Sequence, residues 1–187
     1  AAIEDSLSLA TTVSLNIETP GKEHFDLLSR KKDYERDILH PLRLMGRLTR
    51  KGMRFSKVKC TTQFIVGASH ETDAEIIDSL FGLYNQMNFK RVYFSAYQKG
   101  LGDPEIPGER KFLSSSEKPF LREHRLYQVD FLSRKYGFAR EDILCDTTGN
   151  LRLDKDPKEV WAEHHPECYP VRVNTADREA LLRVPGL

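Results

Sequence analysis

Asn16 and Glu18 are the first residues whose types and spacing suggest chemistry. They stand two positions apart in VSLNIE (13–18), where every second residue is apolar, so the alternation predicts a strand with one polar face. An amide and a carboxylate on that face can together donate to and accept from vicinal hydroxyls or an amino group. If the face lines a barrel interior, the pair is predicted to bind a ligand. The alternative is an edge strand whose polar face meets solvent.

A second candidate lies in QFIVGASHETDAE (63–75). Gly67 stands where a predicted strand ends, and a glycine there allows the backbone to approach a ligand closely. Glu71 stands near the start of the helix predicted next. The alternative is a tight strand-to-helix turn in which Glu71 or Thr72 caps the helix. Such a turn would be present without any ligand.

Cationic side chains gather later in the chain. Arg122 and Arg125 lie in one helical stretch, and Arg110, Lys111 and His124 are near them in the sequence. Together they could meet the phosphates of a nucleic acid. The alternative is an ordinary solvated helix face.

The stretch VNTADREALLRVPGL (173–187) predicts a helix with Asn174 or Thr175 at its N-cap. A break at Val184, Pro185 and Gly186 follows. In a helix-hairpin-helix, a turn of this kind and the next helix aim backbone N–H groups at a phosphate. These three residues are therefore candidate nucleic-acid contacts, and we expect the second arm of the hairpin to lie beyond the last residue. The alternative is an ordinary helix stop.

The composition fits a soluble protein with a real core. The 187 residues are 39% hydrophobic and 30% charged, with a net charge of +1, and no apolar run approaches membrane length. Cys60, Cys145 and Cys168 are far apart and form no CxxC motif, which favours packed thiols in a reducing compartment. We therefore expect a cytoplasmic protein. The histidines show no metal-ligand spacing, so no metal site is predicted.

The elements that would position these residues alternate along the first half of the chain. The pattern predicts strands separated by helices long enough to bring each strand back parallel, so the fold class is α/β. A long loop at 99–118 follows, and 119–187 is predicted as an all-helical extension. The predicted strands are 13–18, 59–68 and 91–97, and the main helices are 33–52, 71–87, 119–137 and 157–165.

Taken together, these segments resemble the family of radical S-adenosylmethionine (SAM) proteins assigned to DNA modification or repair, which carry a helix-hairpin-helix after the barrel. The likeness covers nearly the whole chain in the family's order. It implies that 1–98 is the C-terminal half of a radical SAM (β/α) barrel, and that the extension ends in part of a helix-hairpin-helix. The segments that carry it are VSLNIETP, TTQFIVGASHETDAEII, RVYFSAYQ, LREHRLYQVDFLSRKYGF, GNLRLDKDPKEVWAEHHPECYPVRVN and NTADREALLRVPGL.

The resemblance also implies which residues contact S-adenosylmethionine. The first strand would supply an N-x-[DE] pair, the second strand a GxIxGxxE-like segment with a glutamine near the position of its first glycine, and the third strand its backbone beside the adenine. The implied contacts are Asn16, Glu18, Gln63, Gly67, Glu71 and Ser95.

The family's CxxxCxxC loop, which binds a [4Fe–4S] cluster, does not occur in this sequence. We therefore expect a C-terminal fragment that cannot cleave S-adenosylmethionine alone. For the intact protein, the resemblance implies two cofactors, S-adenosylmethionine and the [4Fe–4S] cluster. It implies nucleic acid, and DNA in particular, as the partner. The alternatives are a non-catalytic nucleic-acid-binding module and a radical SAM enzyme acting on a small molecule or protein. A half-barrel exposes sheet edges, so we also expect self-association or covering of the edge by the extra helices.

Overall fold

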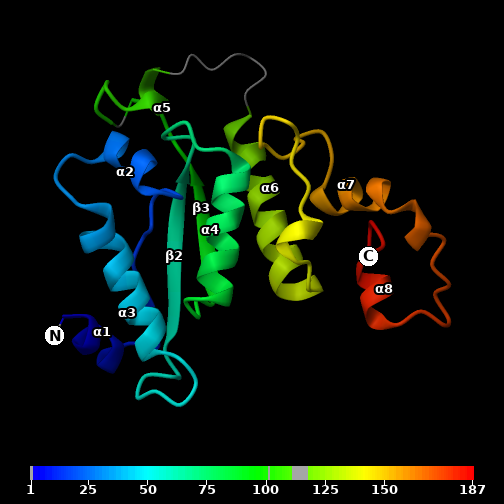
Figure 1. Ribbon diagram of the computed structural model, residues 1–187, viewed down its shortest axis with the longest axis horizontal. Coiled ribbons are helices and arrows are strands. Elements are labelled where there is room, and N and C mark those ends of the chain that lie inside the picture. Colours follow the sequence, from blue (N-terminus) through cyan, green and yellow to red (C-terminus); the bar gives the residue numbers. More distant parts are fainter. Residues whose placement is uncertain (1, 101, 111–117) are drawn as a thin grey trace.

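The computed structural model describes residues 2–100, 102–110 and 118–187, and its centre is a parallel three-stranded sheet in the order β1-β2-β3 (Figure 1). The strands are β1 (Thr12–Ser14), β2 (Lys59–Val66) and β3 (Arg91–Ala96). The predicted α/β class with three parallel strands is confirmed. The helices are α1 (Ala2–Leu9), α2 (Lys22–Leu28), α3 (His40–Leu48), α4 (Asp73–Asn85), α5 (Pro107–Arg110), α6 (Pro119–Phe131), α7 (Pro157–His164) and α8 (Arg178–Leu182), with π-helical turns at Tyr34–Leu39 and Leu132–Tyr136 and 3-10 turns at Arg140–Asp142 and Pro166–Cys168.

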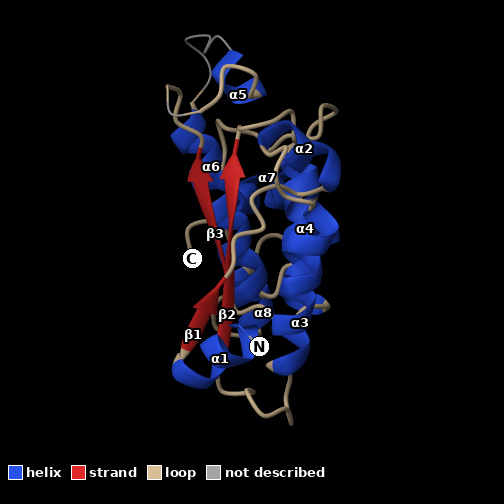
Figure 2. Cartoon of the chain, turned by 90° about the vertical axis from the view of Figure 1, so that its left-hand side faces the viewer, coloured by secondary structure: helices blue, strands red, loops and turns tan. Residues whose placement is uncertain are grey.

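The two faces of the sheet differ in burial. Phe64 and Phe94 point into the core against the helices, where their rings stack with centroids 6.0 Å apart. Gln63 and Ser95 alternate with them and are only partly buried, and Tyr93 on the same face is 42% exposed. Figure 2 looks onto this less buried face, and no helix crosses in front of the upper parts of β2 and β3.

The first strand ends earlier than predicted because a bulge follows it. Ser14 pairs with Thr61 and Glu18 bridges to Phe64, so four steps along the first segment match three steps along β2. The hydroxyl of Thr62 replaces the missing backbone acceptor and binds Ile17 N at 2.9 Å. Glu18 then adopts a left-handed backbone conformation, with φ of 66°. The predicted regular strand 13–18 is therefore wrong beyond Ser14.

The predicted helix 33–52 is continuous at Pro41 but ends earlier. A π-helical turn leads directly into α3, and the change from π- to α-helix occurs beside Pro41, which has no backbone N–H to donate. Gly46 explains how closely α3 can approach its neighbour, since a Cβ there would lie 2.1 Å from the carbonyl oxygen of Met87. The helix ends at Thr49, whose hydroxyl donates to Met45 O at 2.9 Å.

The outer edge of β3 is covered by side chains of α4 and α6. Its outward N–H groups, which a further strand would otherwise bind, each donate to a side-chain oxygen. Tyr127 also donates back to Phe94 O at 3.0 Å, and its ring packs edge-on against Phe94. The covered edge leaves β1 as the edge at which the predicted self-association would have to occur. The hydrogen bonds donated by the outward N–H groups of β3 run from Val92 N to Tyr84 Oη (3.1 Å), from Phe94 N to Tyr127 Oη (3.1 Å) and from Ala96 N to Glu123 Oε2 (2.7 Å).

The C-terminal helices α7 and α8 lie on the side of α6 that faces away from the sheet (Figure 1). Trp161 of α7 packs against Phe138, and the Arg183 guanidinium stacks on both rings at 4.5 and 4.7 Å. The last helix begins later than predicted: Asp177, not Asn174 or Thr175, caps α8 by accepting from Ala180 N at 2.7 Å. Residues 172–176 instead form a turn, because Thr175 N and Ala176 N both donate to Arg172 O.

The structure also bears on the predicted long loop and on the absence of a membrane-spanning helix. The predicted long loop contains the short helix α5, while residues 101 and 111–117, including Lys111, lie outside the described residues. None of the described helices has the length and apolar character that crossing a bilayer would require.

Candidate functional site

Glu18 is the least satisfied acidic group of the sheet. The Asn16 side chain hydrogen-bonds its carboxylate, but Oε2 is buried and has no hydrogen-bond partner among the described residues. Burial raises the pKa of Glu18, and the Asn16 bond and the charge of Lys32 oppose that rise. An acceptor left unsatisfied costs about 1–3 kcal/mol. Because Oε2 is itself buried, a ligand could donate to it only by displacing the atoms that cover it.

Two other predicted contacts lie beside this group. Glu18 N donates to Gln63 O at 3.0 Å, which fixes the end of the first strand against β2. Gln63 pairs in register with Tyr93, and Ile65 pairs with Ser95, so Gln63 and Ser95 lie on the same, less buried face. Gln63 and Ser95 therefore lie on the neighbouring strands β2 and β3, and the segment with Asn16 and Glu18 runs beside β2.

Gly67 and Glu71 form a closed turn between β2 and α4. Gly67 has φ of 90° and donates its N–H to Glu71 Oε1 at 2.5 Å. Glu71 Oε2 accepts from both the N–H and the hydroxyl of Ser69, and Ser69 Oγ in turn lies 3.1 Å from Nδ1 of His24. The cap of α4 is Thr72, which forms a capping box with Glu75. These bonds match the tight-turn alternative for this segment.

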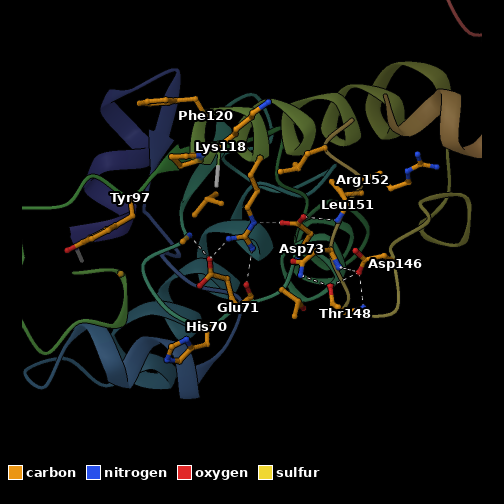
Figure 3. Close-up of a pocket in the computed structure, with 18 of the residues that line it drawn as sticks. His70, Glu71, Asp73, Tyr97, Lys118, Phe120, Asp146, Thr148, Leu151 and Arg152 are labelled. Atoms are coloured by element: carbon orange, nitrogen blue, oxygen red, sulfur yellow. Dashed lines mark hydrogen bonds and ion pairs between the residues drawn. The ribbon is translucent and has the colours of Figure 1, made fainter. Parts of the chain in front are cut away.

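Arg122 joins this turn to α6. Its Nη1 lies 3.3 Å from Glu71 Oε1, its Nη2 donates to Glu71 O at 2.9 Å, and its Nε donates to Asp73 Oδ1 at 2.7 Å. Asp73 Oδ2 accepts from Leu151 N at 2.8 Å, so the loop before α7 is held at the same point. Figure 3 shows Glu71 and Asp73 within this network. The guanidinium thus binds two carboxylates and a carbonyl of the protein itself.

The loop that carries Leu151 also completes the start of α4. Ala74 N donates to Gly149 O at 2.9 Å, and Asp73 N donates to Asn150 Oδ1 at 3.3 Å. Gly149 has φ of 80°, and a Cβ there would lie 3.2 Å from Thr72 Cβ. A glycine is therefore required for the loop to close over the helix.

The remaining predicted nucleic-acid contacts lie on α6 and in the turn after α8. Arg125 donates to Leu153 O at 2.9 Å and to Gln128 Oε1 at 2.7 Å, so it too serves internal contacts. Pro185 and Gly186 are exposed, and Val184 is partly buried. The turn they form is tied to the protein by Leu187 O, which accepts from Lys158 Nζ at 2.7 Å and Tyr136 Oη at 3.1 Å.

A pocket of about 800 Å³ opens beside the carboxyl ends of β2 and β3, where ligands of parallel sheets commonly bind (Figure 3). One side is formed by the loop from Asp146 to Asp154. The other side carries Tyr97 after β3 and Lys118 and Phe120 at the start of α6. Sequence patterns did not identify this pocket. The one signal in the sequence was Phe120, an apolar residue that lies outside the apolar face of its helix.

No family model, curated protein or solved structure matches the chain.

Of the two implied cofactors, S-adenosylmethionine carries groups that an amide and a carboxylate could bind. The unsatisfied Glu18 oxygen beside Asn16 suits the ammonium or hydroxyl groups of S-adenosylmethionine. An iron–sulfur cluster needs several thiolates, but burial raises the pKa of Cys60 and raises that of Cys145 to about 11. In the described part of the chain, Cys168 groups only with His165 and Glu167, which offers a single thiol. These cysteines do not fit the cluster.

Proposed function

We propose that the chain supplies S-adenosylmethionine-binding strands of a cytoplasmic radical SAM enzyme that acts on nucleic acid. The observation that carries the proposal is the buried Glu18 Oε2, which lacks a donor among the described residues at the carboxyl end of a parallel sheet. The three strands would belong to a (β/α) barrel, with the less buried face of the sheet toward its interior.

Each residue of the sheet has a separate part in this proposal. Glu18 would accept from the ammonium group or a ribose hydroxyl, and Asn16, which already bonds the carboxylate, would hold it in place. Gln63 and Ser95 would present polar groups on the less buried face of β2 and β3. Bound S-adenosylmethionine supplies such enzymes with the precursor of a substrate-activating radical. No cluster ligand is assigned to this chain, because its cysteines do not fit one.

Nucleic acid as the substrate has weaker support. The exposed turn at Pro185 and Gly186 leaves backbone available to a phosphate. Arg122 and Arg125 add little to this argument, since both guanidinium groups are bound within the protein. A non-catalytic nucleic-acid-binding module would use the same turn without the sheet.

Titration calorimetry of the 187-residue chain with S-adenosylmethionine, and with S-adenosylhomocysteine as an unreactive analogue, tests the proposal. Glu18→Gln should weaken binding about 10- to 100-fold, because a hydrogen bond to a charged group contributes about 1.5–3 kcal/mol. Glu141→Gln makes the same chemical change at an exposed glutamate and should bind as the wild type does. Absence of binding at millimolar ligand, or equal binding by both variants, would refute the proposal.

A further inference from the structure

We infer that the pocket beside the carboxyl ends of β2 and β3 binds one unpaired nucleotide of a single strand, with the base on Phe120 and a phosphate near Lys118 (Figure 3). The inference rests on the proposed function for its partner, and it names the part of the protein that would hold the substrate. A volume of about 800 Å³ lies within the range of sites that enclose a small organic group.

The aromatic side chains are the first observation. Phe120 is 67% exposed although it stands on the first turn of α6, directly at the rim of the pocket. Tyr97 lies on the same side, and its hydroxyl donates to Glu109 Oε1 at 2.7 Å, which fixes the ring. An exposed aromatic ring beside a cavity can stack with a base of any sequence, since every base has a π-face.

Charge is the second observation, because the lining separates into two halves. The acids belong to the turn before α4, the start of α4 and the loop before α7, and each is already hydrogen-bonded. Glu71 and Asp73 bind Arg122, Asp146 accepts from Thr148 N at 2.8 Å, and Asp154 pairs with Arg152. The other half, with Tyr97, Lys99, Lys118 and Phe120, contains both aromatics and no acid among its pocket-lining residues.

This separation favours an anion near Lys118 and Phe120 rather than near Tyr97, whose hydroxyl already binds Glu109. Lys118 is exposed and directly precedes the turn that carries Phe120, so its ammonium group can reach a phosphate while the base stacks on the ring. A base inside a duplex has both faces covered by its neighbours and would have to be unstacked first. The pocket therefore fits an unpaired nucleotide rather than an intact duplex.

Fluorescence anisotropy with a labelled single-stranded DNA 12-mer tests this inference on the whole chain. Phe120→Leu keeps the apolar volume but removes the ring, so binding should weaken about 5- to 100-fold, as expected for one lost base stack. Phe131→Leu is the matched control, because Phe131 lies at the other end of the same helix and is 46% exposed. A 2-aminopurine at the bound position should lose fluorescence with the wild type and not with Phe120→Leu.

The phosphate contact has its own readout. Lys118→Met should weaken binding and reduce the slope of log affinity against log salt by about 0.7, the value for one phosphate of a single strand. Lys135→Met, at an exposed lysine of the turn that follows α6, should leave the slope unchanged. Equal slopes for the two variants would remove Lys118 from the site.

The remaining outcomes separate this inference from the proposed function. Equal affinity of Phe120→Leu and Phe131→Leu, tighter binding of duplex, or deoxyadenosine monophosphate binding as tightly as the strand would each overturn the inference. Loss of strand binding in Phe120→Leu with S-adenosylmethionine binding retained supports it. If S-adenosylmethionine does not bind but the strand binds through Phe120, the proposed cofactor fails and the pocket assignment stands.

Discussion

Replacing Arg122 by methionine should destabilise the fold strongly, because its guanidinium neutralises two buried carboxylates. The side chains of Glu71 and Asp73 are each 1% exposed, and that of Arg122 is 18% exposed. Methionine retains most of the length and the apolar contacts of arginine. It would leave both acids without their counter-charge, and Glu71 O without its side-chain donor.

The size of the effect follows from the donors that remain. Removing one partner of a buried ion pair costs about 3–5 kcal/mol. Glu71 would keep Gly67 N and Ser69, and Asp73 would keep Leu151 N, so we expect a value near the lower limit, about 3 kcal/mol. Urea unfolding followed by circular dichroism measures this difference. Arg172→Met, at an exposed arginine, should change stability by less than about 0.5 kcal/mol.

A second substitution and a binding assay complete the test. Adding Asp73→Asn to Arg122→Met removes one uncompensated charge, so the double variant should recover part of the lost stability. The reasoning is refuted if Arg122→Met loses less than about 1 kcal/mol but binds single-stranded DNA much more weakly. Arg122 would then face nucleic acid, as its sequence context predicted, and the ion pairs would be marginal.

Two further predictions concern titratable groups. Because burial raises the pKa of Glu18, the folded chain binds more protons than the unfolded chain between the usual glutamate pKa of 4.5 and the raised pKa of the folded state. Stability should therefore fall as pH rises through that window, and urea unfolding should show a smaller fall in Glu18→Gln; an unchanged slope would contradict this. Since burial raises the pKa of both Cys60 and Cys145, a thiol reagent at pH 8 should rapidly modify only exposed Cys168 in the native protein, and all three thiols in urea. Rapid native labelling of Cys145 would contradict its burial.

Periodicity predicted the sheet but could not predict the bulge. The alternation from Val13 to Ile17 is the same in a regular strand and in this one, so the side chains give no sign of an extra residue. What permits the bulge is the Thr62 hydroxyl, which lies on the neighbouring strand 45 residues away and binds Ile17 N. A partner of this kind is identified only once the strands are paired.

The sequence was equally unable to predict which groups the charged residues of the candidate site bind. The sequence shows that Arg122 and Arg125 are cations on a helix, and a phosphate is one partner that suits them. Their partners in the fold, Glu71, Asp73 and Leu153 O, lie 28 to 51 residues away. Long-range pairing therefore decides whether a cation forms a binding surface or an internal bond. By contrast, the acid left unsatisfied in the fold, Glu18, is one of the residues that the sequence predicted as a ligand contact.

The bonds between the start of α4 and residues 149–151 also determine when this helix can be completed during synthesis. Asp73 N and Leu151 N find their partners 77 and 78 residues away in the chain. Closing a segment of that length costs roughly 4 kcal/mol in chain entropy, which these contacts must offset. As the ribosome extends the chain, the Thr72–Glu75 capping box can form early, but Asp73 N and Ala74 N lack their acceptors until residues 149 and 150 emerge. The early half of the protein thus reaches its final form only after residue 151 has left the exit tunnel.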